Sequence, residues 1–164
     1  MSSYAGVGLR PLAAWKGTDG LRPETGPYLK AAAFCTDVIE GKDGVLSLIR
    51  VIDRVTITAA APDAPVSMPP VTHQLKVVLM FVSGRARGTQ PVALKVEDPS
   101  GQIRDGWGGT VFLEGEDRGA NLIIDMSFKF ELQGLYWFHL FLSDDLVTKL
   151  PFRLIYQRVA PGSR

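Results

Sequence analysis

The most constraining feature of the sequence is a set of six apolar side chains that recur with a strict period of two between residues 122 and 132. Apolar residues occupy every second position there, namely Leu122, Ile124, Met126, Phe128, Phe130 and Leu132. The side chains of a β-strand point alternately to the two faces of its sheet, whereas a helix needs a period of about 3.6 residues. This segment therefore predicts a strand with one face in a core and the other in water.

The chain from residue 28 onward contains further segments of this kind. Strands are predicted at 28–39, 45–59, 74–83, 92–97, 110–114, 135–142 and 146–159. Turn sequences such as Asp98-Pro99-Ser100-Gly101 separate them, and no segment carries a sustained helical period. We therefore predict an all-β fold, a single antiparallel β-sandwich that is immunoglobulin-like in broad architecture.

Two local features refine this prediction. A glycine at 134 followed by Tyr136 at the start of a strand is typical of a tyrosine corner, in which the hydroxyl bonds to upstream backbone. Pro151 has no backbone N–H, so its strand is predicted to be an edge strand or to carry a bulge.

The length of 164 residues suits one domain. Residues 1–27 hold five glycines and three prolines without any apolar period, and we interpret them as a flexible N-terminal arm. Trp15 in this arm is a candidate contact with a partner, unless it covers its own domain. The sandwich is predicted to span residues 28–159, followed by a short C-terminal tail at 160–164.

Charge and hydropathy narrow the range of partners. Lys and Arg number 18 and Asp and Glu 17, a balance that argues against nucleic acid and against anionic membranes as general partners. No apolar stretch approaches the roughly 18 residues of a membrane span, and residues 1–10 lack the apolar run of a signal peptide. We expect a cytoplasmic protein whose partners are other proteins or further copies of itself, as a homo-oligomer.

The residues that carry chemistry are few. Cys35 is the single cysteine and is predicted to be buried and structural. The two histidines, His73 and His139, lack the spacing of metal ligands, and the acidic turn residues are scattered. Motifs for serine nucleophiles, dinucleotides and phosphate loops are absent. We therefore predict no catalytic residues, no metal and no cofactor.

Two further sites stand out. Strict alternation places Asp53 beside Val51 and Val55 on the apolar face of its strand. A carboxylate there must either be turned outward by a bulge or be paired, and Asp53 and Arg54 are the candidate structural pair. The segment Gly106-Trp107-Gly108-Gly109 is predicted to be a flexible loop, whose Trp107 is a second candidate contact.

Several of these segments resemble a group of small bacterial β-sandwich proteins that has no assigned activity. The resemblance rests on Cys35 with Val38-Ile39, on Asp43-Gly44 with Leu46-Ser47-Leu48-Ile49, and on Asp53-Arg54. It covers about residues 28–158, later parts of which include 115–124 and 134–138. It implies a bacterial origin and a β-sandwich, and it carries over no catalytic residue.

These observations favour a non-catalytic protein-interaction or assembly module, whose contact is an apolar patch at Trp15 or Trp107 or an unpaired edge strand. The alternative is a sandwich that binds a small ligand or a carbohydrate on a platform of rings. Its candidate lining residues are Trp107, Tyr136, Trp137 and His139. An enzyme would require one of the histidines to lie within hydrogen-bond reach of an acid or nucleophile inside a cleft.

Overall fold

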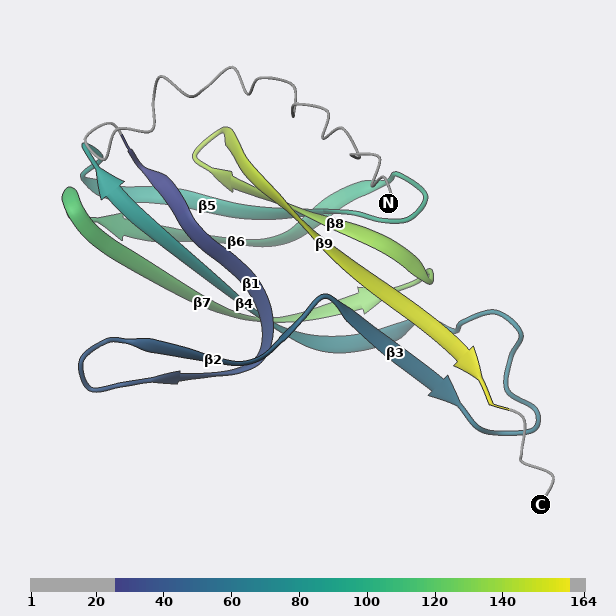
Figure 1. The fold of residues 1–164 in the computed structure, drawn as a ribbon. Coiled ribbons are helices and arrows are strands. Elements are labelled where there is room, and N and C mark those ends of the chain that lie inside the picture. Colours follow the sequence, from purple (N-terminus) through teal and green to yellow (C-terminus); the bar gives the residue numbers. More distant parts are fainter. Residues whose placement is uncertain (1–25, 160–164) are drawn as a thin grey trace, which may run out of the picture.

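The computed structural model describes residues 26–159, which form nine β-strands (Figure 1). They are β1 Tyr28–Glu40, β2 Leu46–Ile52, β3 Arg54–Ala59, β4 Val71–Gly84, β5 Gly88–Glu97, β6 Ile103–Leu113, β7 Glu116–Phe130, β8 Gly134–Leu142 and β9 Asp145–Arg158. The first 25 residues of the predicted arm, with Trp15, and the tail at 160–164 lie outside the described residues. Within residues 26–159, no helix is long and apolar enough to span a membrane.

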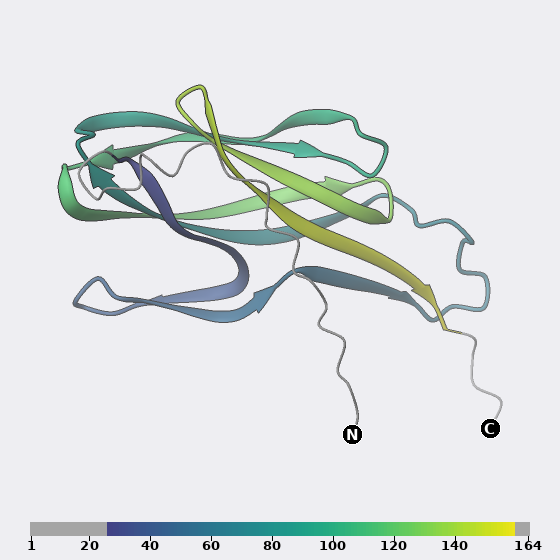
Figure 2. The same ribbon diagram turned by 45° about the horizontal axis from the view of Figure 1, so that its top comes forward.

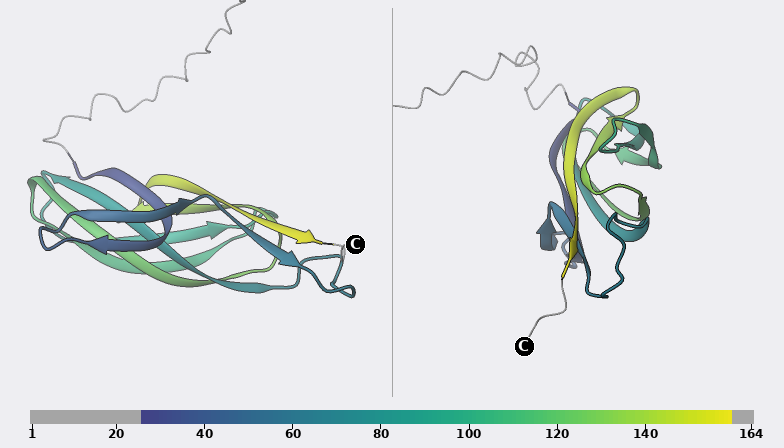
Figure 3. Two further views of the ribbon diagram at one scale, coloured as in Figure 1. Left: turned by 60° about the horizontal axis from the view of Figure 1, so that its bottom comes forward. Right: turned by 90° about the vertical axis from the view of Figure 1, so that its right-hand side faces the viewer.

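The strands form two sheets that face each other across a shared core (Figure 3). One sheet has four strands in the order β2-β1-β4-β7, and the other has five in the order β3-β9-β8-β5-β6. The all-β prediction is confirmed. The predicted antiparallel pairing is found in six of the seven strand pairs, but β3 runs parallel to β9, and one sheet is curled into a half-barrel.

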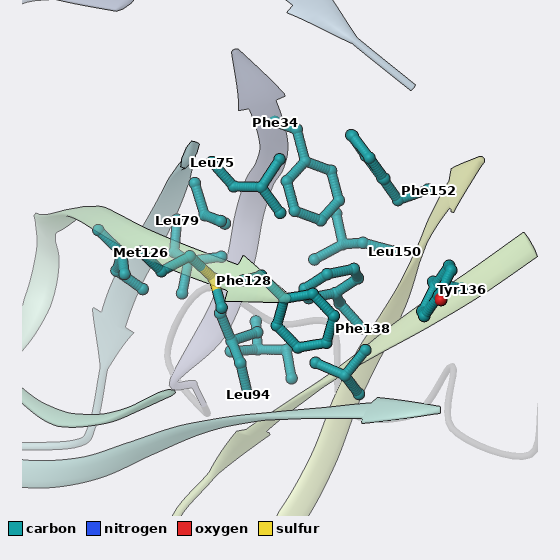
Figure 4. Close-up of a cluster of buried hydrophobic side chains, with 14 of the residues drawn as sticks. Phe34, Leu75, Leu79, Leu94, Met126, Phe128, Tyr136, Phe138, Leu150 and Phe152 are labelled. Carbon is teal, nitrogen blue, oxygen red and sulfur yellow. The ribbon is translucent and has the colours of Figure 1, made fainter. Parts of the chain in front are cut away.

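The alternating segment at 122–132 supplies the centre of the core (Figure 4). β7 contributes four side chains that are at most 6% exposed, Ile124, Met126, Phe128 and Phe130. From the same sheet, the ring of Phe34 in β1 packs edge-to-face on two rings of the facing sheet, Phe138 at 4.9 Å and Phe152 at 5.0 Å between centroids. Such edge-to-face contacts add to the apolar area that these rings remove from water.

The segment at 45–59 was predicted as one strand, but it forms two strands in different sheets. β2 ends immediately before Asp53 and β3 begins immediately after it. At this crossing the carbonyl of Asp53 accepts a hydrogen bond from the backbone nitrogen of Arg153 at 2.8 Å. The crossing inverts the alternation, so Val51 points away from the core and is 64% exposed, whereas Val55 packs against the core.

The same crossing accounts for Pro151 in β9. This strand lies between β8 and β3, yet β3 reaches along it only as far as Arg153. Residues 151 and 153 turn their backbone nitrogens to the same side of the strand. The nitrogen of Pro151 therefore faces the side where β3 has not yet begun, and no ladder hydrogen bond is lost. The edge prediction is correct at this residue, although β9 as a whole is an interior strand.

Tyr136, at the start of β8, makes the predicted hydrogen bonds between its hydroxyl and the backbone that precedes the strand. Its side chain is 1% exposed, and its hydroxyl donates to the carbonyl of Leu132 at 2.7 Å and accepts from the nitrogen of Leu132 at 3.1 Å. Burial raises the pKa of the Tyr136 hydroxyl. Leu132, the last of the six alternating residues, lies beyond the end of β7 and is 44% exposed.

The segment Gly106-Trp107-Gly108-Gly109 is not the predicted loop but the middle of β6. Gly106 occupies a bulge in the ladder to β5, where a Cβ atom would lie 2.8 Å from Cγ2 of Val96. The ring of Trp107 is half-buried against the core and covers Gly109, whose Cβ atom would collide with it. These two glycines are required by close packing within a strand and not by loop flexibility.

Candidate interaction surface

The end of β1 and the whole of β2 form a two-stranded ribbon that stands apart from the other strands (Figure 2). β1 pairs with β4 only as far as Cys35, which lies opposite Lys76. Beyond this point, and within residues 26–159, β1 pairs with β2 alone and β2 pairs with nothing else. We call residues 36–52 the β1–β2 ribbon. Its outer edge presents backbone groups that can pair with another strand.

The β1–β2 ribbon carries apolar side chains on both of its faces. Four of the eleven large apolar residues that are exposed within residues 26–159 share one face, namely Ile39, Val45, Ile49 and Val51, at 58%, 61%, 38% and 64% exposure. The opposite face holds Val38, Leu46, Leu48 and Ile52, which are partly buried. An antiparallel sheet with one solvated face normally turns polar side chains to water, so this ribbon departs from the usual pattern.

Cys35 lies at the root of the ribbon, opposite Val51, and is 1% exposed. The predicted buried position is confirmed. Burial raises the pKa of the thiol, and the nearby ammonium of Lys76 opposes this effect more weakly. The group at this position is therefore a neutral thiol near neutral pH, without the lowered pKa of a reactive cysteine.

The predicted pair of Asp53 and Arg54 lies at the base of the ribbon. Nε and Nη2 of Arg54 donate to the two carboxylate oxygens of Asp53 at 3.0 and 3.1 Å. The hydrogen bond from Arg54 holds the pKa of the Asp53 carboxyl below its usual range. Both side chains are mostly exposed, so Asp53 is turned outward and is also paired, and the two alternatives that the sequence left open occur together. The crossing between sheets turns it into water, where a pair contributes little to stability.

Arg50 interrupts the ribbon ladder. It has a φ of +50°, in the left-handed region that favours glycine. The ladder pairs residues 35 with 51 and 37 with 49 but leaves out Thr36 and Arg50. The hydroxyl of Thr36 instead donates to the carbonyl of Ile49 at 3.0 Å. The backbone of Arg50 therefore carries about 1 kcal/mol of strain in β2, the terminal strand of its sheet.

A second cluster of polar and aromatic side chains lies on the outer face of the five-stranded sheet. Nε2 of His139 lies 2.9 Å from a carboxylate oxygen of Glu97, and the side chain of His139 is only 8% exposed. Glu97 and Trp137 also line a shallow hollow of about 460 Å³. The turn at 98–101 and Leu135 complete its lining. A histidine and an acid are thus in contact, but the histidine is buried beside this hollow.

The four rings proposed as a ligand platform do not come together. Tyr136 belongs to the core, and Trp107 packs against the core from β6. Trp137 and His139 lie on the opposite face of the five-stranded sheet, where Trp137 lines the hollow beside Glu97. His73 lies near the start of β4, in the other sheet. Within the described range 26–159, no three or more His, Cys, Asp or Glu side chains gather as a metal site.

Sequence reasoning missed the β1–β2 ribbon, although a signal for it is present. Between residues 45 and 52 both the odd and the even positions are apolar, except at Ser47 and Arg50. A single strand of a sandwich would need only one of these two sets to face the core. The interruption of the pattern at Asp53 marks the point where the chain leaves the ribbon for the second sheet.

Comparisons with known proteins give only distant similarities. No protein-family model matches the sequence, and no curated protein matches it. Among solved structures, the chain is similar to the β-glucosidase from Listeria innocua in complex with isofagomine, at 8% identity and a TM-score of 0.41 over 84% of this chain. The complex of that enzyme with glucose gives 7% identity and a TM-score of 0.42 over the same share. The chain spans less than a fifth of the length of these β-glucosidase chains, 18% in both cases.

A further similarity is to the Pseudomonas fluorescens alkylpurine DNA glycosylase AlkC bound to DNA containing an abasic site analog. The identity is 7% and the TM-score 0.34, over 61% of this chain and 27% of that one. We draw no argument about activity from similarities at this level.

Proposed function

We propose that this chain is a non-catalytic protein-interaction module that uses the β1–β2 ribbon as its contact surface. The observation that carries the proposal is the exposure of Ile39, Val45, Ile49 and Val51 on a ribbon whose outer edge is open. An isolated two-stranded ribbon is marginally stable in water, and a third strand or a packed face is needed to stabilise it. A partner that adds a strand to β2 supplies both, through backbone hydrogen bonds and through apolar contacts.

The architecture in which this ribbon is set is, in our proposal, immunoglobulin-like. The order β4-β7 in one sheet and β9-β8-β5 in the other corresponds to strands B and E and to strands G, F and C of that fold. Tyr136 at the start of β8 corresponds to the tyrosine corner of strand F. In this correspondence the start of β1 and β3 together take the place of the first strand, and the β1–β2 ribbon is an insertion between them. The ribbon is therefore not needed for the sandwich and can serve as a contact.

The proposal is tested by comparing what matched variants retain. The full chain is immobilised and exposed to an extract of its native host, and retained proteins are identified by mass spectrometry. Ile49→Lys places a charge on the exposed face of β2, whereas Ile103→Lys makes the same change at an exposed residue of β6, in the other sheet. We expect a defined protein, or the chain itself, to be retained by wild type and by Ile103→Lys and lost with Ile49→Lys. Equal retention by all three, or by none, contradicts the proposal.

A second candidate function rests on the hollow beside Trp137, which an acidic side chain, Glu97, also lines. An indole at the edge of an open polar hollow suits the stacking of a small ligand or a sugar ring. A glycan and metabolite screen tests it. Binding that is lost in Trp137→Ala and kept in Trp107→Ala would favour this function over the first.

A further inference from the structure

We propose that the partner of the β1–β2 ribbon is a second copy of this chain, paired antiparallel through β2. This inference rests on the proposed function and names its partner. The two four-stranded sheets would join edge to edge as one sheet of eight strands around a two-fold axis. Such a contact is isologous, because the same strand is used by both copies.

The sequence of β2 is self-complementary in the register of full overlap. Complete overlap of Leu46–Ile52 with its copy centres the axis on Ile49, so that each Ile49 lies opposite the other. The remaining opposed pairs are Leu46 with Ile52, Ser47 with Val51 and Leu48 with Arg50. No like charges are opposed, and the central pair buries the exposed Ile49 side chains against each other. The register one step further toward the C-terminus would place Arg50 opposite Arg50 and is disfavoured.

Charge along the ribbon favours the antiparallel arrangement. The tip holds Glu40 and Asp43 with one lysine between them, whereas the base holds Arg50 and Asp37 together with the Asp53–Arg54 pair. Arg50 is exposed and forms no ion pair within residues 26–159. Antiparallel pairing brings the acidic tip of one copy toward the arginine-bearing base of the other. A parallel arrangement would bring like ends together.

The edge of β2 also carries few of the features that protect edge strands from pairing. It contains no proline and no lysine, and Arg50 is its single charged residue. By contrast, the edge strand β7 carries five charged residues, Glu116, Asp117, Arg118, Asp125 and Lys129. The left-handed backbone at Arg50 removes one rung from the ladder. We expect the hydrogen bonds between copies to form on both sides of this residue and not at it.

The test measures molar mass in solution by light scattering over a hundredfold range of concentration. Wild type and Ile103→Lys are expected to reach twice the chain mass of 17.9 kDa, whereas Ile49→Lys and Val51→Lys remain at that mass. Circular dichroism checks that each variant is folded. Two lysine variants are used so that the test remains valid if one of them does not fold. A wild type that stays monomeric at the highest concentration overturns the inference, as does a dimer that both lysine variants retain.

Cross-linking tests the register. Under mild oxidation Ile49→Cys is expected to form a disulfide-linked dimer, because the axis places residue 49 of the two copies side by side. Ile103→Cys, equally accessible but on β6, is the control and should not form one above the wild-type background from the buried Cys35. Equal cross-linking of both variants overturns the register. A monomeric wild type that still retains another protein through the ribbon refutes this inference and leaves the proposed function standing.

Discussion

Substitution of Gly106 by alanine is expected to destabilise the fold, and the same change at Gly108 is not. Both glycines belong to the Gly-Trp-Gly-Gly segment of β6, and neither has a left-handed backbone. A Cβ atom at 106 would lie 2.8 Å from Cγ2 of Val96 and 3.0 Å from the carbonyl oxygen of Leu94. A Cβ atom at 108 would meet nothing within 4 Å.

The magnitude follows from two opposing terms. Carbon atoms pack best at about 3.5–4.0 Å, so the added methyl group at 106 must displace Val96 or the backbone of β5 by several tenths of an ångström. Overpacking of this kind costs about 1–3 kcal/mol. Each glycine-to-alanine change also stabilises by about 0.4–1 kcal/mol, through the smaller freedom of the unfolded chain. This second term is common to both variants, so the difference between them isolates the steric cost at Gly106.

The assay is unfolding in guanidinium chloride, followed by far-ultraviolet circular dichroism because Trp107 lies too close for its fluorescence to be a neutral probe. Gly106→Ala should lose about 1–2 kcal/mol of unfolding free energy, and Gly108→Ala should be unchanged or slightly more stable. For a chain of this length, 1 kcal/mol corresponds to roughly 2–4 °C in Tm. Two variants of equal stability would refute the argument, since residues 106–109 would then behave as the open loop that their composition suggests.

Three further predictions concern single side chains. Tyr136→Phe should lose about 1–2 kcal/mol of unfolding free energy, because both hydrogen bonds between its hydroxyl and the backbone of Leu132 disappear. Tyr156→Phe loses one exposed hydrogen bond and should change little in the same denaturation assay. Arg50→Gly should raise the thermal midpoint by the equivalent of about 0.5–1 kcal/mol, because glycine adopts the left-handed backbone without strain; a lowered midpoint would show that this conformation is not strained. Hydrogen bonding from Ser100 holds the pKa of the Asp98 carboxyl below its usual value in the folded protein. The Asp98 carboxylate therefore contributes stability above about pH 4, and this contribution is lost as the pH falls through the pKa of Asp98 in the folded state. Denaturation curves of wild type and Asp98→Ala should therefore converge below about pH 4, and a gap that is constant with pH would contradict this assignment.

The elements that periodicity predicts best are those in which one strand keeps one face in the core. The alternation at 122–132 gives β7 its core face directly, and the glycine before Tyr136 correctly indicates the hydroxyl bond. The glycines at 106–109 mislead because composition alone does not distinguish a flexible loop from a strand that is packed too closely for side chains. Only the positions of neighbouring residues, such as Val96, reveal which case applies.

The β1–β2 ribbon could not be predicted because alternation is a local property and the crossing at Asp53 is not. Val51 and Val55 have the same parity in the sequence, yet one faces water and the other faces the core. The decisive constraint is the parallel pairing of β3 with β9, a strand almost a hundred residues further along the chain.

The two ends of the β1–β2 ribbon lie next to each other, and this position bears on why its side chains are exposed. The chain enters the ribbon after Phe34 and Cys35 and returns from it at Val51 and Ile52, and Phe34 lies directly opposite Ile52. Entry and exit are therefore neighbours, and the sandwich closes around its core whether or not the ribbon is there. Apolar side chains that a core does not require are a liability in water unless another surface covers them. Under the proposed function, association with another strand and not folding accounts for the apolar face of β2, and the matched lysine variants test this assignment.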